Sequence, residues 1–105
     1  MSIVARDQGG NIVDAYTPST AQVFAAGNTT AQSAAFGLNT TLVRVSCSLG
    51  HCHVAFGANP TASITTSMMM ENNNSTVFKV NGGDKMAYIK DATVTASTVC
   101  VTELL

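Results

Sequence analysis

The sequence predicts an all-β domain in which short antiparallel strands form a sandwich or a barrel. Runs of alternating apolar and polar residues are separated by Gly, Asn and Pro, at the spacing typical of such folds. No long window places apolar residues at i, i+3, i+4 and i+7, the pattern of an amphipathic helix. Hydrophobic residues make up 46% of the 105 residues and many are β-branched, which argues against disorder. A chain of this length holds a single core.

The alternating runs predict nine strands, joined by segments that contain turn-forming residues. Glycine in "QGGN" (8–11) and "NGGD" (81–84) supplies the positive φ of a tight turn, and Asp84 is expected to cap its turn by accepting backbone N–H bonds. The segment "TAQVFAA" (20–26) fits a helix and a strand equally well. The predicted strands are Ile3–Arg6, Asn11–Tyr16, Gln22–Ala26, Thr41–Ser48, His51–Gly57, Thr66–Met70, Thr76–Val80, Lys85–Lys90 and Thr98–Leu104.

The first forty residues differ in composition from the rest, because they are rich in Ala, Gly, Gln and Thr. We therefore divide the chain into residues 1–40, an N-terminal arm or set of edge strands, and residues 41–105, the β-sandwich core. An arm would become ordered against a neighbouring molecule. The candidate contacts with a partner in this segment are its widely spaced large apolar residues, Val23, Phe24, Phe36 and Leu38.

The low charge and the short apolar runs of the sequence argue against two classes of partner. Lys and Arg number only five, with no cluster, so we expect no nucleic-acid partner. No apolar run is long enough to cross a bilayer, so we expect no membrane partner, and no signal-peptide pattern opens the sequence. A low charge with much Thr, Ser and Asn is typical of a β-rich protein in an assembly or outside a cell.

The segment "SCSLGHCHVAFG" (46–57) places two cysteines and two histidines within seven residues. It predicts a β-hairpin whose two-residue loop is Leu49-Gly50, with Gly50 in the left-handed conformation. In that hairpin Cys47 lies opposite Cys52. Because side chains alternate along a strand, both cysteines would then face the core.

The two histidines of this segment, His51 and His53, would face the opposite side, and they are expected to line a solvated or interfacial sheet face. One tetrahedral metal ion cannot easily collect ligands from both faces, so we predict no metal site and no cofactor. Cys47 and Cys52 are expected to be a pair of buried thiols or a cross-strand disulfide, the latter after release from a reducing cytosol. Cys100 is the remaining thiol.

No pattern in the sequence points to catalysis. Asp91 and Glu103 stand alone on different segments, and neither a nucleophile elbow nor a phosphate-binding glycine loop is present. We therefore predict no catalytic residues and that the chain is not an enzyme. In the run Met68–Met70, strand alternation sends Met68 and Met70 one way, with the core as the expected surroundings, and Met69 the other way, where Met69 is a candidate partner contact.

Three segments resemble small structural proteins of tailed bacteriophages: "CHVAFGANPTAS" (Cys52–Ser63), "VFKVNGGDKMAYI" (Val77–Ile89) and "VCVTEL" (Val99–Leu104). The shared pattern is Cys-His-hydrophobic-Ala-hydrophobic-Gly, an Asn-Pro-Thr-Ala turn, a Gly-Asp-Lys strand start and a final Val-Thr-Glu-Leu. The similarity covers about half of the chain, from Arg44 onward. The sequence departs from the pattern in its methionine run and in Cys47.

The resemblance implies a jelly-roll β-sandwich and a role as a head decoration (cement) protein on the capsid exterior, made in the host cytoplasm. Such proteins bridge capsomers and stabilise the shell. The implied partners are the major capsid protein and further copies of the chain, as a trimer ahead of a dimer. Two alternatives are another virion component (a head-fibre base, tail or baseplate subunit) and a carbohydrate-binding jelly-roll module. The absence of Trp weakens the last.

Overall fold

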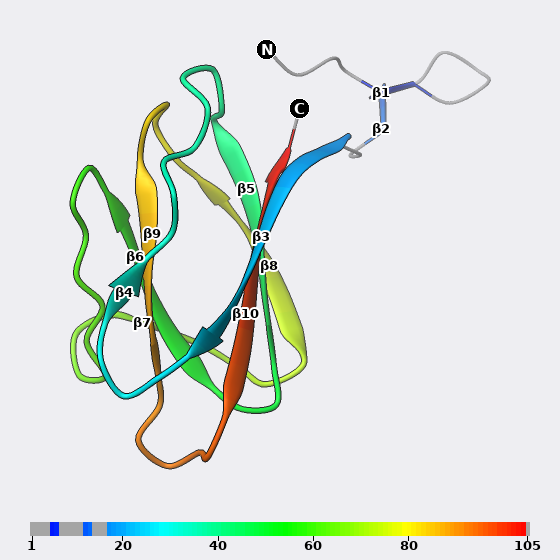
Figure 1. Cartoon of the computed structure of the whole chain (residues 1–105). Coiled ribbons are helices and arrows are strands. Elements are labelled where there is room, and N and C mark those ends of the chain that lie inside the picture. Colours follow the sequence, from blue (N-terminus) through cyan, green and yellow to red (C-terminus); the bar gives the residue numbers. More distant parts are fainter. Residues whose placement is uncertain (1–4, 7–11, 14–16, 105) are drawn as a thin grey trace.

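Two four-stranded antiparallel sheets pack face to face in the computed structural model of the chain, which describes residues 5–6, 12–13 and 17–104 (Figure 1). The first sheet has the strand order β3-β10-β5-β8, and the second sheet has the order β4-β9-β6-β7. The prediction of an all-β, jelly-roll-like sandwich is confirmed. The strands are β1 Ala5–Arg6, β2 Ile12–Val13, β3 Pro18–Ala26, β4 Ala31–Gln32, β5 Leu42–Ser48, β6 Cys52–Gly57, β7 Met68–Met70, β8 Asn74–Lys79, β9 Lys85–Lys90 and β10 Ser97–Leu104.

Most of the predicted strands lie where alternation placed them. The strand Lys85–Lys90 has the predicted bounds. The strand Ala31–Gln32 was not predicted, because two small or polar residues give no alternation to detect. The predicted strands Ile3–Arg6 and Asn11–Tyr16 lie partly outside the described residues, and what the structure describes of them pairs as β1 with β2. No helix in the described part is long and apolar enough to cross a membrane.

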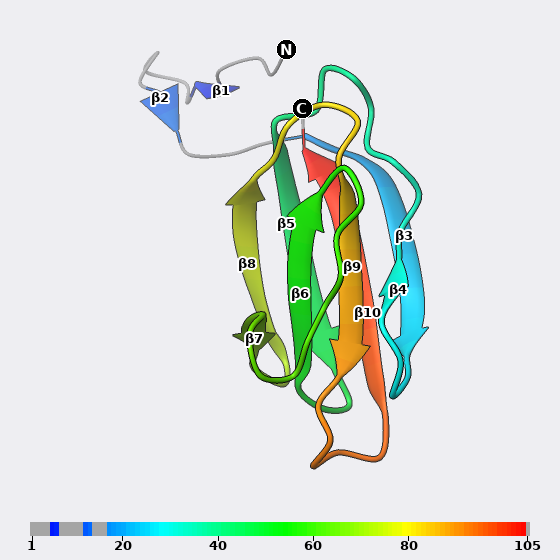
Figure 2. The ribbon, with the colours of Figure 1, turned by 90° about the vertical axis from the view of Figure 1, so that its left-hand side faces the viewer.

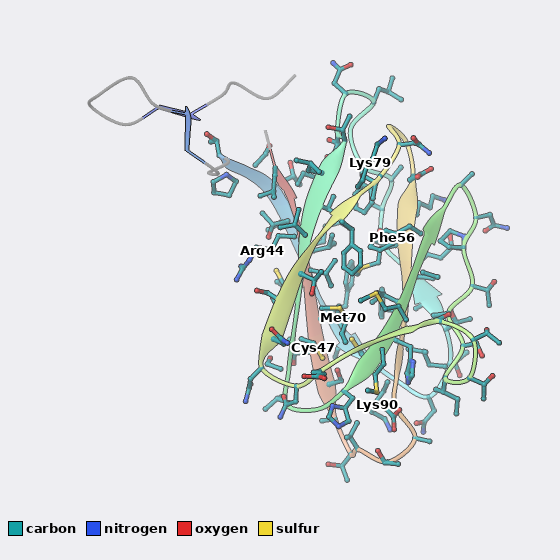
Figure 3. All side chains as sticks on the ribbon, turned by 180° about the vertical axis from the view of Figure 1, so that it is seen from behind. Arg44, Cys47, Phe56, Met70, Lys79 and Lys90 are labelled. Atoms are coloured by element: carbon teal, nitrogen blue, oxygen red, sulfur yellow. The ribbon has the colours of Figure 1, made fainter. Side chains whose placement is uncertain are left out.

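The core fills the space between the two sheets, and every second residue of each inner strand points into it (Figure 3). The ring of Phe24 on β3 stacks on Tyr88 of β9, with centroids 4.5 Å apart, and so joins the two sheets near one edge. Burial of these apolar side chains is the main contribution to the stability of the fold. The buried core residues are Ala26, Phe36, Val43, Val45, Cys47, Cys52, Val54, Met70, Val80, Met86, Tyr88, Val99 and Val101.

The predicted hairpin at Leu49-Gly50 is wrong, because the chain crosses there from one sheet to the other. Cys47 on β5 pairs with Val99 and Asn74 in the first sheet, whereas β6 belongs to the second sheet. Leu49, rather than Gly50, has the positive φ of 69°. A Cβ at Gly50 would lie 2.4 Å from the carbonyl oxygen of Ala96, so glycine permits this crossing by close packing rather than by φ.

The alternation behind the hairpin prediction is nevertheless correct for both cysteines. Cys47 faces the core from the first sheet and Cys52 faces it from the second, where it pairs with Lys90 and Met70. The two thiols therefore belong to opposing sheets and are not directly opposite each other on paired strands, as the hairpin required.

Residues from the first forty form edge strands of both sheets. The strand β3 is at the edge of the first sheet beside β10, and β4 is at the edge of the second sheet beside β9 (Figure 2). The side-chain amide of Gln22 joins them: its oxygen accepts from the N–H of Ala34 at 2.9 Å, and its NH₂ group donates to the Ala34 carbonyl at 3.4 Å. The division of the chain at residue 41 stays a prediction.

Two turns show how local sequence fixes the ends of strands. Asp84 accepts a hydrogen bond from the N–H of Asn81 at 3.1 Å, as predicted, and Gly83 has a φ of 82°. In the methionine run, Met70 is buried in the core, but Met68 is 52% exposed at the end of the short edge strand β7. The expectation that Met68 packs in the core is therefore wrong.

Candidate functional site

A cluster of polar side chains lies on the outer face of the second sheet, around His53. Because Cys52 and Val54 face the core, His53 between them faces outward, as predicted. It is not solvated, however, since only 6% of it is exposed. Its Nδ1 lies 3.2 Å from the carbonyl oxygen of Ser67, and its Nε2 lies 2.8 Å from Oδ2 of Asp91.

The register of β6 with β9 brings Asp91 to this histidine. His53 lies opposite Ile89, and Asp91 follows β9 by one residue on the same side of the sheet. The two residues are 38 positions apart in the chain. No partner for Asp91 is therefore visible in the sequence, and only knowledge of the pairing of β6 with β9 would have identified His53 as one.

The bonding of His53 defines what this cluster can do. A carbonyl oxygen and a carboxylate oxygen are both acceptors, so each is a suitable partner for an N–H of the imidazole ring, and the tautomer decides which nitrogen donates. An oriented His–carboxylate pair is a common catalytic arrangement. Here both ring nitrogens are bonded within the protein, and neither is free to exchange a proton with a bound substrate. In this conformation the pair fastens the segment before β7 to the end of β9.

Asp91 also organises the turn that follows β9. Its Oδ1 accepts from the hydroxyl of Thr93 at 2.6 Å and from the N–H of Thr93 at 2.9 Å. These hydrogen bonds and the one with His53 hold the pKa of the Asp91 carboxyl well below its ordinary value of 3.8. The carboxylate is therefore the stable form of Asp91 in the folded protein.

Replacement of Asp91 by asparagine is expected to make the free energy of unfolding depend less on pH in acid. Because the folded-state pKa lies below the ordinary value, the carboxylate stabilises the fold above about pH 4, and this contribution disappears as the pH falls further. Urea unfolding between about pH 2 and pH 6 measures the difference. The exposed carboxylate Glu71, changed to Gln, is the control and should leave the profile unaltered. Equal acid sensitivity of wild type and Asp91→Asn would contradict this role.

The second polar cluster lies in the core, around Cys47 and Cys52, which the structure holds as free thiols. The Cys47 thiol donates to the carbonyl oxygen of Gly50 at 2.7 Å, and its sulfur lies 3.4 Å from Oγ of Ser97. Burial raises the pKa of the Cys52 thiol, and the neighbouring Cys47 raises it further. A thiol with a raised pKa carries little thiolate, so Cys52 is poorly suited to nucleophilic or redox chemistry.

Native alkylation is expected to distinguish the three cysteines. Cys100 is half-buried on the outer face of the first sheet, whereas Cys47 and Cys52 are buried in the core. Iodoacetamide should therefore modify Cys100 first in the folded protein, and all three residues after denaturation. Mass spectrometry of peptides from timed samples measures the order. Modification of Cys52 as fast as that of Cys100 would contradict the buried placement.

The residues predicted to contact a partner divide into two groups. Val23, Leu38 and Met69 are exposed on the described surface. Phe24 and Phe36 are not available for such contacts, because Phe36 is buried and Phe24 packs against the core. Both aromatic side chains alternate inward from edge segments, and spacing in the sequence alone could not show this.

Within the described residues, no group of three or more His, Cys, Asp or Glu side chains is placed to hold a metal ion. The side chain of His51 has a different partner from that of His53, since its Nδ1 accepts from the N–H of Asn72 at 3.3 Å. The backbone of His51 does meet Asp91, because its carbonyl oxygen accepts from the Asp91 N–H at 3.1 Å.

No protein-family model and no curated protein matches the chain. Among solved structures, the chain is similar to FeII HppE in complex with substrate, with a TM-score of 0.51 and 10% identity over 95% of this chain and 60% of that one. FeII HppE alone gives a TM-score of 0.51 and 9% identity, over 96% of this chain and 55% of that one. The cupin domain of Schizosaccharomyces pombe Cnp3 gives 0.45 and 12%, over 99% and 81%. This chain spans less than two thirds of the HppE chains, and the likeness is one of fold.

The prediction that the chain is not an enzyme is wrong in view of this comparison. HppE shares the fold and was solved with FeII and with a substrate, so a jelly-roll of this kind does not exclude catalysis. The prediction relied in part on Asp91 standing alone in the sequence. The His53–Asp91 pair shows that strand pairing gives this carboxylate a partner that lies far away in the chain.

Proposed function

We propose that the chain is a structural subunit of a tailed-bacteriophage virion, of the head decoration type. It binds the outer surface of the major capsid protein lattice and stabilises the shell. The observation that carries this proposal is the placement of the phage-like segments. Cys52–Ser63, Val77–Ile89 and Val99–Leu104 supply β6, β9 except Lys90, half of β8 and most of β10. These include three of the four central strands of the two sheets, β6, β9 and β10.

The "ANPTA" turn, which also belongs to the phage-like pattern, helps to hold the sandwich together. Pro60 and Ala62 are buried beside the second sheet. The Pro60 carbonyl accepts from Nε2 of Gln32 at 2.8 Å, and the Ala62 N–H donates to Oγ1 of Thr30 at 2.9 Å. These bonds fix the segment after β6 against the β4 edge. The motif residues thus build a rigid small fold, which is what a cement protein needs.

The surface offers apolar contacts with little competing charge. The net charge of the chain is −1, and charged residues are 10% of it. On a symmetric lattice, many copies with modest individual contacts attach strongly through effective concentration. We propose a homo-trimer as the attached form. The exposed large apolar residues of the described part are Val23, Leu38, Leu49, Ile64, Met68, Met69 and Val77.

Copy number in the virion and the heat resistance of the shell test this function. Hundreds of copies per particle, and shells that open at lower temperature when made without the protein, are the expected results. A dozen copies or fewer would favour the alternative of a tail, baseplate or fibre subunit. Shells equally resistant with and without the protein would overturn the cement role, and glycan-array binding by the isolated protein would favour a carbohydrate-binding module.

A further inference from the structure

Leu38 is the most exposed of the large apolar side chains that the structure describes, with 86% of its surface open to solvent. It lies in the turn Gly37–Thr40, where the N–H of Thr40 donates to the carbonyl oxygen of Gly37 at 3.0 Å. This turn closes one end of the sandwich, just before β5. An exposed leucine on a mobile loop would need no explanation. The surroundings of this one are firmly held.

A buried carboxylate fixes the turn from below. Oε1 of Glu103 accepts from the N–H of Gly37 at 2.8 Å and from the hydroxyl of Thr40 at 2.5 Å. Both Glu103 and Thr40 are buried. Phe36, the residue before the turn, is in the core, and its N–H donates to the carbonyl oxygen of Asp84 at 2.8 Å. Hydrogen bonds to a buried carboxylate are among the stronger bonds in proteins, so the backbone on both sides of Leu38 is held in place.

A second turn supports Leu38 from the side. Gly82 packs so closely on the Leu38 backbone that a Cβ at this position would lie 1.9 Å from the Leu38 carbonyl oxygen. Cδ2 of Leu38 would lie 3.6 Å from a Cβ at Gly83. The backbone of Leu38 is therefore confined by Glu103, Phe36 and Gly82 while its side chain points to solvent. A residue whose backbone is already held in this way loses little backbone freedom when it binds.

We infer that Leu38 is an anchor that inserts into an apolar pocket on the capsid lattice, so that this end of the sandwich faces the shell. The inference rests on the proposed function and specifies the contact that attachment uses. One consideration favours the lattice over a second copy of the chain as the partner. One leucine buries far less than the roughly 1,200 Å² that a stable pair of proteins needs, whereas attachment in many copies tolerates a small contact.

Substitution of Leu38 by Asp tests the anchor, with Leu49→Asp as the matched control. Leu49 is also exposed, at 70%, but it follows β5 whereas Leu38 precedes it. Seven strand residues at about 3.3 Å each place the two leucines about 20 Å apart, at opposite ends of the sandwich. Binding is measured by co-sedimentation with empty shells assembled from the major capsid protein encoded in the same genome. We expect Leu38→Asp to weaken binding about tenfold or more and Leu49→Asp to leave it unchanged.

The other possible results of this experiment would each overturn one part of the proposal. Wild-type protein that does not bind the shells would overturn the proposed function, and the anchor with it. Wild type and Leu38→Asp binding equally would overturn the anchor alone. Loss of binding by Leu49→Asp instead would reverse the orientation. A changed oligomeric state of Leu38→Asp in analytical ultracentrifugation would identify a second copy as the partner and overturn the lattice pocket.

The fixed geometry of the turn has its own test in Thr40, which acts as a positioning residue. Thr40→Val removes the hydroxyl that donates a hydrogen bond to Glu103, whereas Thr40→Ser keeps this hydroxyl. We expect Thr40→Val to weaken binding to the shells about threefold to tenfold although Leu38 is unchanged, and Thr40→Ser to bind the shells as the wild type does. Far-UV circular dichroism and a thermal unfolding curve for both variants confirm the fold. Wild-type binding by folded Thr40→Val would show that the anchor does not depend on a fixed turn.

Discussion

Replacement of Met70 by alanine is expected to lower the free energy of unfolding by about 2–5 kcal/mol. Met70 is 2% exposed, and its pairing with Cys52 turns its side chain into the space between the sheets (Figure 3). Alanine would leave a cavity there, and the facing strands are too tightly packed to fill it. Urea unfolding followed by circular dichroism measures the change.

Met69→Ala is the matched control for this loss. Met69 is the neighbour of Met70 in the same strand, but its side chain points to the outer face and is 46% exposed. We expect a change within about 0.5 kcal/mol. Equal losses for the two variants would mean that the edge strand β7 as a whole, rather than the cavity at Met70, determines the effect.

Replacement of Gly82 by alanine is expected to cost about 3 kcal/mol or more, although only one methyl group is added. The new Cβ would meet the backbone oxygen of Leu38 at 1.9 Å, and backbone atoms on both sides cannot move without separating two turns. The shift would also disturb the hydrogen bond from the Phe36 N–H to the Asp84 carbonyl. A lower thermal unfolding midpoint measures this loss.

Gly27→Ala is the control for the glycine prediction. A Cβ at Gly27 would have no atom within 4 Å, so alanine should be neutral or slightly stabilising there. If Gly82→Ala were as stable as Gly27→Ala, the close packing of the two turns, and with it the support beneath Leu38, would not exist in solution.

The fold class was predictable because strand alternation is a local property. The polar residues next to Val43, Val45 and Val54 in the sequence predict that these valines face the core, and all three are buried there. The partner of each strand is not local. Val45 pairs with Val101 on one side and Thr76 on the other, and no feature of the β5 sequence indicates either.

The candidate site was predictable only in part, for the same reason. The sequence indicated that the cysteines of the 46–57 segment face inward and the histidines outward. It did not indicate that Asp91 reaches His53 or that Glu103 holds Thr40, because each pair is joined by contacts between distant segments. The hairpin prediction failed because Leu49-Gly50 fits a two-residue loop by composition, while the close approach of Gly50 to Ala96 sends the chain to the other sheet.

The central position of β10 has a consequence for how the protein is made. This strand lies between β3 and β5, and it pairs Ala26 with Ser97 across most of the chain. The first sheet therefore cannot be completed until residues 97–104 have left the ribosome. Pairing between segments so distant also predicts slow folding, on the scale of milliseconds to seconds. A nascent chain that still lacks β10 would expose apolar inner faces and would depend on chaperones until β10 is synthesised.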